Sequence, residues 1–150
     1  MKGTVVSVNV SEKKGTAKTP TDRLMLLPGL GVAGDAHAAP GDRQVSLLML
    51  ESIEAARTGA ECKLNEGVEL VPGSYAENIT TSGINLLALK LGDTLRAGAA
   101  RLRVTKIGKE CPRPCAIYYK LGSCIMPREG IFCEVLAGAE VRPGDEIATD

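Results

Sequence analysis

Apolar and polar residues alternate along most of this chain, in short runs that are separated by glycine, proline and acidic residues. A period of two is typical of a β-strand with one buried and one exposed face, and the run from Arg101 to Thr105 shows it most clearly. The pattern predicts strands at Thr4–Val10, Leu24–Leu27, Gln44–Leu48, Val68–Val71, Asn78–Thr81, Thr94–Arg96, Arg101–Ile107, Ile131–Leu136 and Glu146–Thr149.

One segment has the periodicity of a longer helix. Ile53, Ala56 and Ala60 recur at helical spacing and predict a helix over Leu50–Ala60. Many short strands with few helices predict a mainly β protein, a closed or nearly closed β-barrel with a few short helices. A chain of 150 residues without a visible boundary is expected to form a single domain over residues 1–150.

The charge of the chain is balanced overall but unevenly distributed. Its 18 Lys and Arg match 18 Asp and Glu, yet the stretch from Arg101 to Glu129 carries seven basic and two acidic residues. Overall neutrality and few stacking aromatics (one Phe, three Tyr, no Trp) argue against a nucleic-acid-binding protein. No apolar run is long enough to span a membrane, and the first residues do not resemble a signal peptide. Five cysteines, an odd number, then favour reduced thiols and a cytoplasmic location.

The basic stretch also concentrates the thiols, because it holds Cys111, Cys115 and Cys124. A thiol in an electropositive setting ionises near neutral pH, and the thiolate is the form that acts as a nucleophile and as a metal ligand. We therefore expect the chemistry of this protein in this segment.

Cys111 is the best placed of these cysteines. A short helix that begins at Pro112 would place Cys111 at its N-cap, where free N–H groups and the helix dipole stabilise a thiolate. Lys109 and Arg113 flank it and act in the same direction. Cys115 follows about one turn later on the same face, so it is a candidate resolving thiol or second ligand.

The cysteines have two other interpretations. Free cysteines are most often small buried side chains; this alternative stays open for Cys111 and Cys115 and is preferred for Cys62, Cys124 and Cys133. The cysteine spacing contains no CxxC pair and no nearby histidine, so no zinc site is expected.

The glycine-rich stretch and the loop after it suggest an anion site more than a nucleotide site. Gly29–Gly34 matches G-x-G-x-x-G but leads into a loop instead of a helix, so no nucleotide is expected. His37 and Arg43 lie in that loop, directly before a predicted buried strand. The planar fork of arginine suits a phosphate or a carboxylate.

Five blocks in this order resemble the MOSC domain. They are Gly34–His37 (GDAH), Arg43–Leu48 (RQVSLL), Pro72–Thr81 (PGSYAENITT), Ile107–Cys111 (IGKEC) and Gly122–Phe132 (GSCIMPREGIF). MOSC domains form the C-terminus of molybdenum-cofactor sulfurases and also occur as small stand-alone bacterial proteins. The resemblance implies a mainly β, barrel-like fold and a role with the molybdenum cofactor, molybdopterin.

The reactive cysteine of the family maps onto Cys111, which the resemblance implies is the catalytic thiol. In relatives this cysteine is proposed to carry sulfur or, in reductase members, to ligate molybdenum, for which a thiolate is a suitable soft ligand. Pro112 stands where stand-alone relatives often have a histidine, so His37 is the one imidazole of the chain. The residues expected to contact the cofactor are His37, Arg43, Asn78, Lys109, Arg113 and Arg128.

Three functions fit this resemblance. The first is a protein that binds molybdopterin or molybdenum and carries or transfers sulfur through Cys111. The second is a molybdenum-dependent reductase of N-hydroxylated compounds that works with a separate electron donor, and the third is a cofactor carrier without chemistry. Sulfur delivery implies a pyridoxal-phosphate-dependent cysteine desulfurase or a molybdoenzyme recipient as partner.

Overall fold

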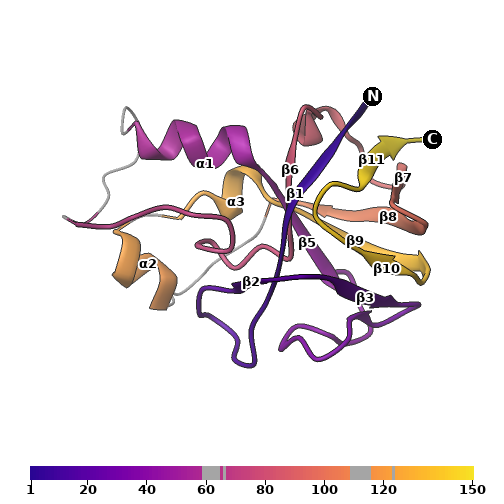
Figure 1. The fold of residues 1–150 in the computed structure, drawn as a ribbon, viewed down its shortest axis with the longest axis horizontal. Coiled ribbons are helices and arrows are strands. Elements are labelled where there is room, and N and C mark those ends of the chain that lie inside the picture. The colour runs from indigo at the N-terminus through magenta and orange to yellow at the C-terminus, as the bar shows by residue number, and fades with distance from the viewer. Residues whose placement is uncertain (59–64, 66, 109–115, 123) are drawn as a thin grey trace.

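The computed structural model describes residues 1–58, 65, 67–108, 116–122 and 124–150, and it is mainly β (Figure 1). The strands are β1 (Lys2–Val10), β2 (Thr19–Thr21), β3 (Leu24–Leu27), β4 (Gly31–Val32), β5 (Val45–Met49), β6 (Ile79–Ser82), β7 (Thr94–Ala97), β8 (Ala100–Ile107), β9 (Ile131–Ala137), β10 (Glu140–Val141) and β11 (Glu146–Thr149). The helices are α1 (Leu50–Arg57), α2 (Ala116–Leu121), α3 (Met126–Glu129) and a 3₁₀ turn, η1 (Leu86–Ala88).

Seven of the strands close into a barrel, as the sequence predicted. Their order is β11-β7-β8-β9-β5-β6-β1, and β11 pairs back onto β1 in the register Lys2 to Ala148. Closure leaves no unpaired edge in the ring. Outside it, β2 extends β1, and β10, β3 and β4 form a small second sheet. Of the described helices, none is long and apolar enough to cross a membrane.

Strand β5 is buried on both faces because the protein has two apolar cores. Val45, Leu47 and Met49 face the barrel interior, whereas Leu48 belongs to a second cluster outside the barrel wall. Strands β5 and β6 form the one parallel pair among the described strands. The chain must therefore cross over between them, and α1 lies in that crossover.

The second core is built from the helices and the segment before β6. Its buried side chains come from α1 (Ile53, Ala56), α2 (Ile117, Leu121), α3 (Met126), β5, β9 and the loops between them (Leu70, Tyr75, Ile125). Figure 1 shows these helices together on one side of the barrel. This arrangement places α2 directly beside the segment that precedes β6.

Most predicted elements are confirmed, and one is wrong. The predicted helix is observed over Leu50–Arg57, with Thr58 in a turn and residues 59 and 60 outside the described residues. Val68–Val71 is not a strand. The Val71 N–H donates to the Ser74 hydroxyl of the following turn, and the Arg57 guanidinium donates to the Leu70 carbonyl. The Val68 N–H donates to the Asn65 carbonyl and the Val71 carbonyl accepts from the Ser74 N–H, so turn contacts and side chains take the place of a neighbouring strand.

Candidate functional site

A buried lysine lies at the centre of the polar contacts beside the barrel. Lys18 directly precedes β2, and its side chain has no exposed surface. Its Nζ lies 2.8 Å from Asp35 Oδ1, 3.0 Å from Ser11 Oγ and 3.0 Å from His37 Nδ1. A charge removed from water needs such partners, because an unpaired one costs several kcal/mol.

Asp35 is the counter-charge of Lys18 and joins two loops. Its carboxylate accepts backbone N–H groups from Ser11 and His37, each at 3.0 Å. Burial would raise the pKa of this carboxyl, but its contacts with His37, with the Lys18 ammonium and with the Ser11 N–H outweigh burial and hold the pKa well below its usual range. Asp35 is therefore an anion at neutral pH.

The contact with Lys18 determines which nitrogen of His37 is available. An ammonium group has hydrogens to donate and no lone pair, so Nδ1 of His37 must accept. In this contact the Nε2 atom of His37 carries a hydrogen, and the side chain is 29% exposed. His37 consequently presents a fixed N–H donor at the surface, as a residue that contacts an anion requires.

The sequence analysis singled out His37 but not Lys18. Lys18 lies in a polar run, Thr16 to Pro20, that has the composition of an exposed loop. Its burial depends on Asp35, which lies 17 residues later. No local signal marks such a pair.

Arg43 and Arg128 are both exposed. The Cζ atom of Arg43 lies 5.8 Å from the centre of the Phe132 ring on β9, a cation–π contact. The loop before β5 is tied to β8, because the Thr105 hydroxyl donates to the Asp42 carbonyl at 2.6 Å. Arg43 thus lies against the barrel wall and Arg128 lies on α3, whereas His37 contacts Lys18.

Asn78 lies inside the barrel wall, not on a rim. Its Oδ1 accepts from the Ser46 amide and hydroxyl at 3.1 and 3.2 Å, and its Nδ2 donates to the Asn9 carbonyl at 3.3 Å. The side chain thereby joins three neighbouring strands, and the residue is 1% exposed.

Glu77, which sequence reasoning also missed, organises the turn before β6. It is fully buried and accepts hydrogen bonds from Gly73 N, Tyr75 N and Thr80 Oγ1, at 3.0, 3.3 and 2.7 Å. Burial raises the pKa of this carboxyl in spite of those bonds. The turn packs on Lys18, since a Cβ at Gly73 (φ +90°) would lie 2.2 Å from the Lys18 carbonyl oxygen.

The predicted reactive segment is described at its two ends. Cys111, Cys115, Lys109 and Arg113, like Cys62, lie outside the described residues, so the predicted helix start at Pro112 does too; α2 is described from Ala116 onward. Before the segment, the Gly108 N–H donates to the Gly130 carbonyl at 2.8 Å, and a Cβ there would lie 2.6 Å from the Pro127 carbonyl oxygen.

The two described cysteines are packed side chains. Cys133 on β9 is fully buried in the barrel core, and burial raises the pKa of its thiol far above the usual range. Cys124 is half-buried against the second core. Cys133 therefore lacks the accessible setting of a reactive thiol.

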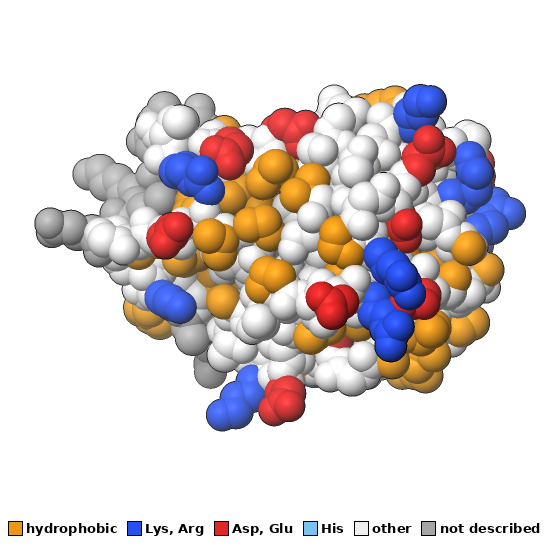
Figure 2. Space-filling model, viewed as in Figure 1, with side chains coloured by type: hydrophobic (Ala, Val, Ile, Leu, Met, Phe, Trp, Pro, Cys, Tyr) orange, Lys and Arg blue, Asp and Glu red, His pale blue; other side chains and the backbone are white. Residues whose placement is uncertain are grey.

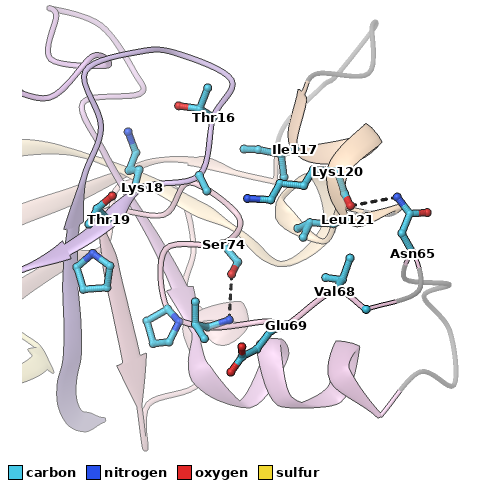
Figure 3. Close-up of a pocket in the computed structure, with 15 residues that line it drawn as sticks. Thr16, Lys18, Thr19, Asn65, Val68, Glu69, Ser74, Ile117, Lys120 and Leu121 are labelled. Atoms are coloured by element: carbon cyan, nitrogen blue, oxygen red, sulfur yellow. Dashed lines mark hydrogen bonds between the residues drawn. The ribbon is translucent and has the colours of Figure 1, made fainter.

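A cavity of about 640 Å³ opens between α2, the segment that leads into β2, and the turn before β6 (Figure 3). Its lining residues are Thr16, Ala17, Lys18, Thr19, Pro20, Asn65, Gly67, Val68, Glu69, Val71, Pro72, Ser74, Ile117, Lys120 and Leu121. Of the predicted cofactor residues that the structure describes, none is part of this lining.

Asn65 fixes the C-terminal end of α2 beside the cavity. Its side-chain amide donates to the carbonyls of Tyr119 and Lys120 at 2.7 and 3.0 Å, and its backbone N–H donates to the Leu121 carbonyl at 2.7 Å. These carbonyls have no partners within the helix, so Asn65 acts as a cap supplied from another segment. Within the described ranges, no group of three or more His, Cys, Asp or Glu could hold a metal ion.

Three comparisons relate the chain to known proteins. The model of the MOSC domain family matches residues 33–148. A search of curated proteins found no match. Among solved structures, YuaD from Bacillus subtilis shares 23% identity and a TM-score of 0.75, over 98% of this chain and 94% of that one. YiiM from Escherichia coli shares 23% identity and a TM-score of 0.69, over 100% of this chain and 70% of that one. YiiM from Geobacillus stearothermophilus shares 20% identity and a TM-score of 0.73, over 99% and 75%.

Proposed function

Because the chain belongs to the MOSC domain family, which is associated with the molybdenum cofactor, we propose that it binds this cofactor and carries sulfur on Cys111. The observation that carries the proposal is the family match itself, since residues 33–148 include Cys111 and its basic neighbours. Cys133 is buried in the barrel core and Cys124 packs against the second core, which supports Cys111 as the thiol that carries sulfur.

The described residues fit an anionic cofactor in part. Arg43 and Arg128 are exposed cations whose planar groups suit a phosphate, and His37 offers a fixed Nε2–H donor. We assign these three to the cofactor phosphate, together with Lys109 and Arg113 of the cysteine segment.

Asn78 does not fit that role. Its amide oxygen and nitrogen already bond to Ser46 and Asn9 inside the barrel wall. We therefore propose that Asn78 holds β6 against its neighbours and leaves the cofactor to the exposed donors.

The sulfur step is a thiol exchange at Cys111. Its thiolate attacks the outer sulfur of a persulfide on the donor, a new S–S bond forms at Cys111, and the donor cysteine leaves as a thiolate. The positive charges of Lys109 and Arg113 favour the thiolate that starts this step. When bound, the cofactor supplies a molybdenum centre, for which sulfur is a suitable soft ligand. The donor we propose is a pyridoxal-phosphate-dependent cysteine desulfurase, and the recipient is a molybdoenzyme.

Replacing Cys111 by serine tests this function. The wild-type protein, purified from a host that makes the cofactor, is expected to retain molybdenum and pterin, measured by metal analysis and pterin fluorescence. Incubation with a cysteine desulfurase and cysteine should add one sulfur atom to the peptide that contains Cys111, detected by mass spectrometry. Cys111→Ser should lose the persulfide, with a change in unfolding free energy within about 0.5 kcal/mol.

Cys124→Ser is the matched control and should keep both the cofactor and the persulfide. A wild-type protein that carries neither molybdenum nor pterin and accepts no sulfur would refute the proposal. Unfolding of Cys111→Ser, combined with an unreactive Cys111 in the wild type, would show that this cysteine is a packed structural residue.

A further inference from the structure

The cavity beside α2 has the character of a ligand site that is separate from the proposed cofactor contacts. Its volume, about 640 Å³, lies in the range of small-molecule sites in proteins. Most of its walls are apolar, from Ala17, Pro20, Val68, Ile117 and Leu121. Figure 2 shows that apolar side chains gather across the middle of this face of the molecule, with charged side chains mostly around them.

One accessible cation faces this apolar space. Figure 3 shows the Lys120 side chain reaching from α2 across the cavity toward the segment that carries Thr16. Among the described residues Lys120 forms no ion pair. The ammonium of Lys18 is turned away and is neutralised by Asp35. The carboxylate of Glu69 also points away from Lys120 in this view.

The polar groups in the cavity lining restrict which ligands the cavity can bind. The Ser74 hydroxyl accepts the Val71 N–H at 2.9 Å, which leaves its own hydrogen for a ligand. Thr16 donates to the Lys13 carbonyl, and the amide of Asn65 donates to α2. A ring system with many polar edges, such as a pterin, would find few partners here, because most of these donors are already used.

We propose that this cavity binds an organic monoanion with an apolar body, whose acidic group pairs with Lys120 and accepts from Ser74. The apolar walls hold the body, and the ammonium of Lys120 selects the acidic head group. The proposal does not depend on the function of Cys111, because it is argued from the described lining residues alone, which belong to the segments 16–20, 65–74 and 117–121.

Two matched fluorescent probes test it on the intact protein. Anilinonaphthalene sulfonate is an aromatic monoanion, and phenylnaphthylamine has the same rings without the charge. Both should bind the wild-type protein with saturable fluorescence. Lys120→Met should weaken binding of the sulfonate about five-fold and leave the neutral probe unchanged, since an exposed charge pair contributes up to about 1 kcal/mol.

Filling the cavity with a large side chain is the second test of the proposal. Ala17 is exposed and lines the cavity, so Ala17→Trp should fill it and abolish binding of both probes without disturbing the core. Thr19→Trp, at another exposed lining position, should do the same if the first variant does not fold. Ala99→Trp, in the exposed turn between β7 and β8, is the control and should bind as the wild type does.

Cys111→Ser should bind both probes normally, which separates this proposal from the sulfur function. Binding that survives both tryptophan variants would place the probes elsewhere and overturn the proposal. An equal effect of Lys120→Met on both probes, or no effect on either, would overturn the assignment of an anion to Lys120.

Discussion

Lys18 and Asp35 form an ion pair whose two side chains have no exposed surface. Lys18 lies in the loop between β1 and β2, and Asp35 lies in the loop that follows β4. Because the pKa of Asp35 is lowered in the folded state, its contribution to stability is present above the usual carboxyl pKa and is lost as the pH falls through the folded value. The sequence singled out His37 and its neighbours as a candidate site, which stays a prediction. The burial of Lys18 was not, because it results from a contact between distant segments.

Removing Lys18 should destabilise the protein strongly. Lys18→Met leaves the Asp35 carboxylate buried without its counter-charge, which typically costs about 3–5 kcal/mol. Urea unfolding near neutral pH measures the change. The control is Arg103→Met, which breaks an exposed pair with Glu134 and should cost less than about 1 kcal/mol. Similar losses in the two variants would contradict a special role for the buried pair.

At the scale of elements, the alternation of apolar and polar residues predicted strands well where a neighbouring strand on each side supplies the backbone hydrogen bonds. Strand β8 alternates because one of its faces is buried in the barrel core and the other is exposed. Val68–Val71 also alternates but runs into the turn at Pro72 and Gly73, and its backbone bonds to turn residues and side chains instead of a neighbouring strand. Short elements such as β4 and α3 are defined by their tertiary neighbours, and their sequences carry too few residues to show a period.

Helix α2 should depend on a residue outside it. Asn65→Ala removes the two side-chain hydrogen bonds to the Tyr119 and Lys120 carbonyls, so we expect a loss of about 1–2 kcal/mol in unfolding free energy and faster amide exchange in α2. Asn85→Ala, which removes the cap of η1, is the comparison and should leave amide exchange in α2 unchanged. Unaltered exchange in α2 after Asn65→Ala would show that apolar packing alone holds the helix.

For the whole molecule, the number and length of the strands were sufficient to predict a barrel, but not which strands meet. The interface between the barrel and the helices depends on β5 being buried on both faces, which a run of apolar residues allows but does not specify. The cavity has no sequence signature either, because its walls come from three segments that are far apart in the chain.

The adjacency of the chain ends predicts a tolerated circular permutation. The amino group of Met1 lies 2.8 Å from the Thr149 hydroxyl. A short glycine linker between residues 150 and 1, with new ends in the exposed turn at Gly98 and Ala99, should therefore give a folded protein with an unchanged far-UV spectrum and cooperative unfolding. New ends inside β5 should abolish folding, because that strand is buried on both faces. A permutant opened at Gly98 that fails to fold, while the one opened in β5 succeeds, would contradict this account of the barrel.

The pairing of β1 with β11 also determines when the barrel can close during synthesis. The first strand emerges from the ribosome early, yet Lys2 at its start pairs with Ala148, near the other end of the sequence. Until that partner is made, the interior of the incomplete barrel stays accessible to water and to other chains. Closure of the barrel therefore has to wait until β11 has been synthesised, and a chain that lacks β11 exposes apolar strand faces that the complete barrel buries.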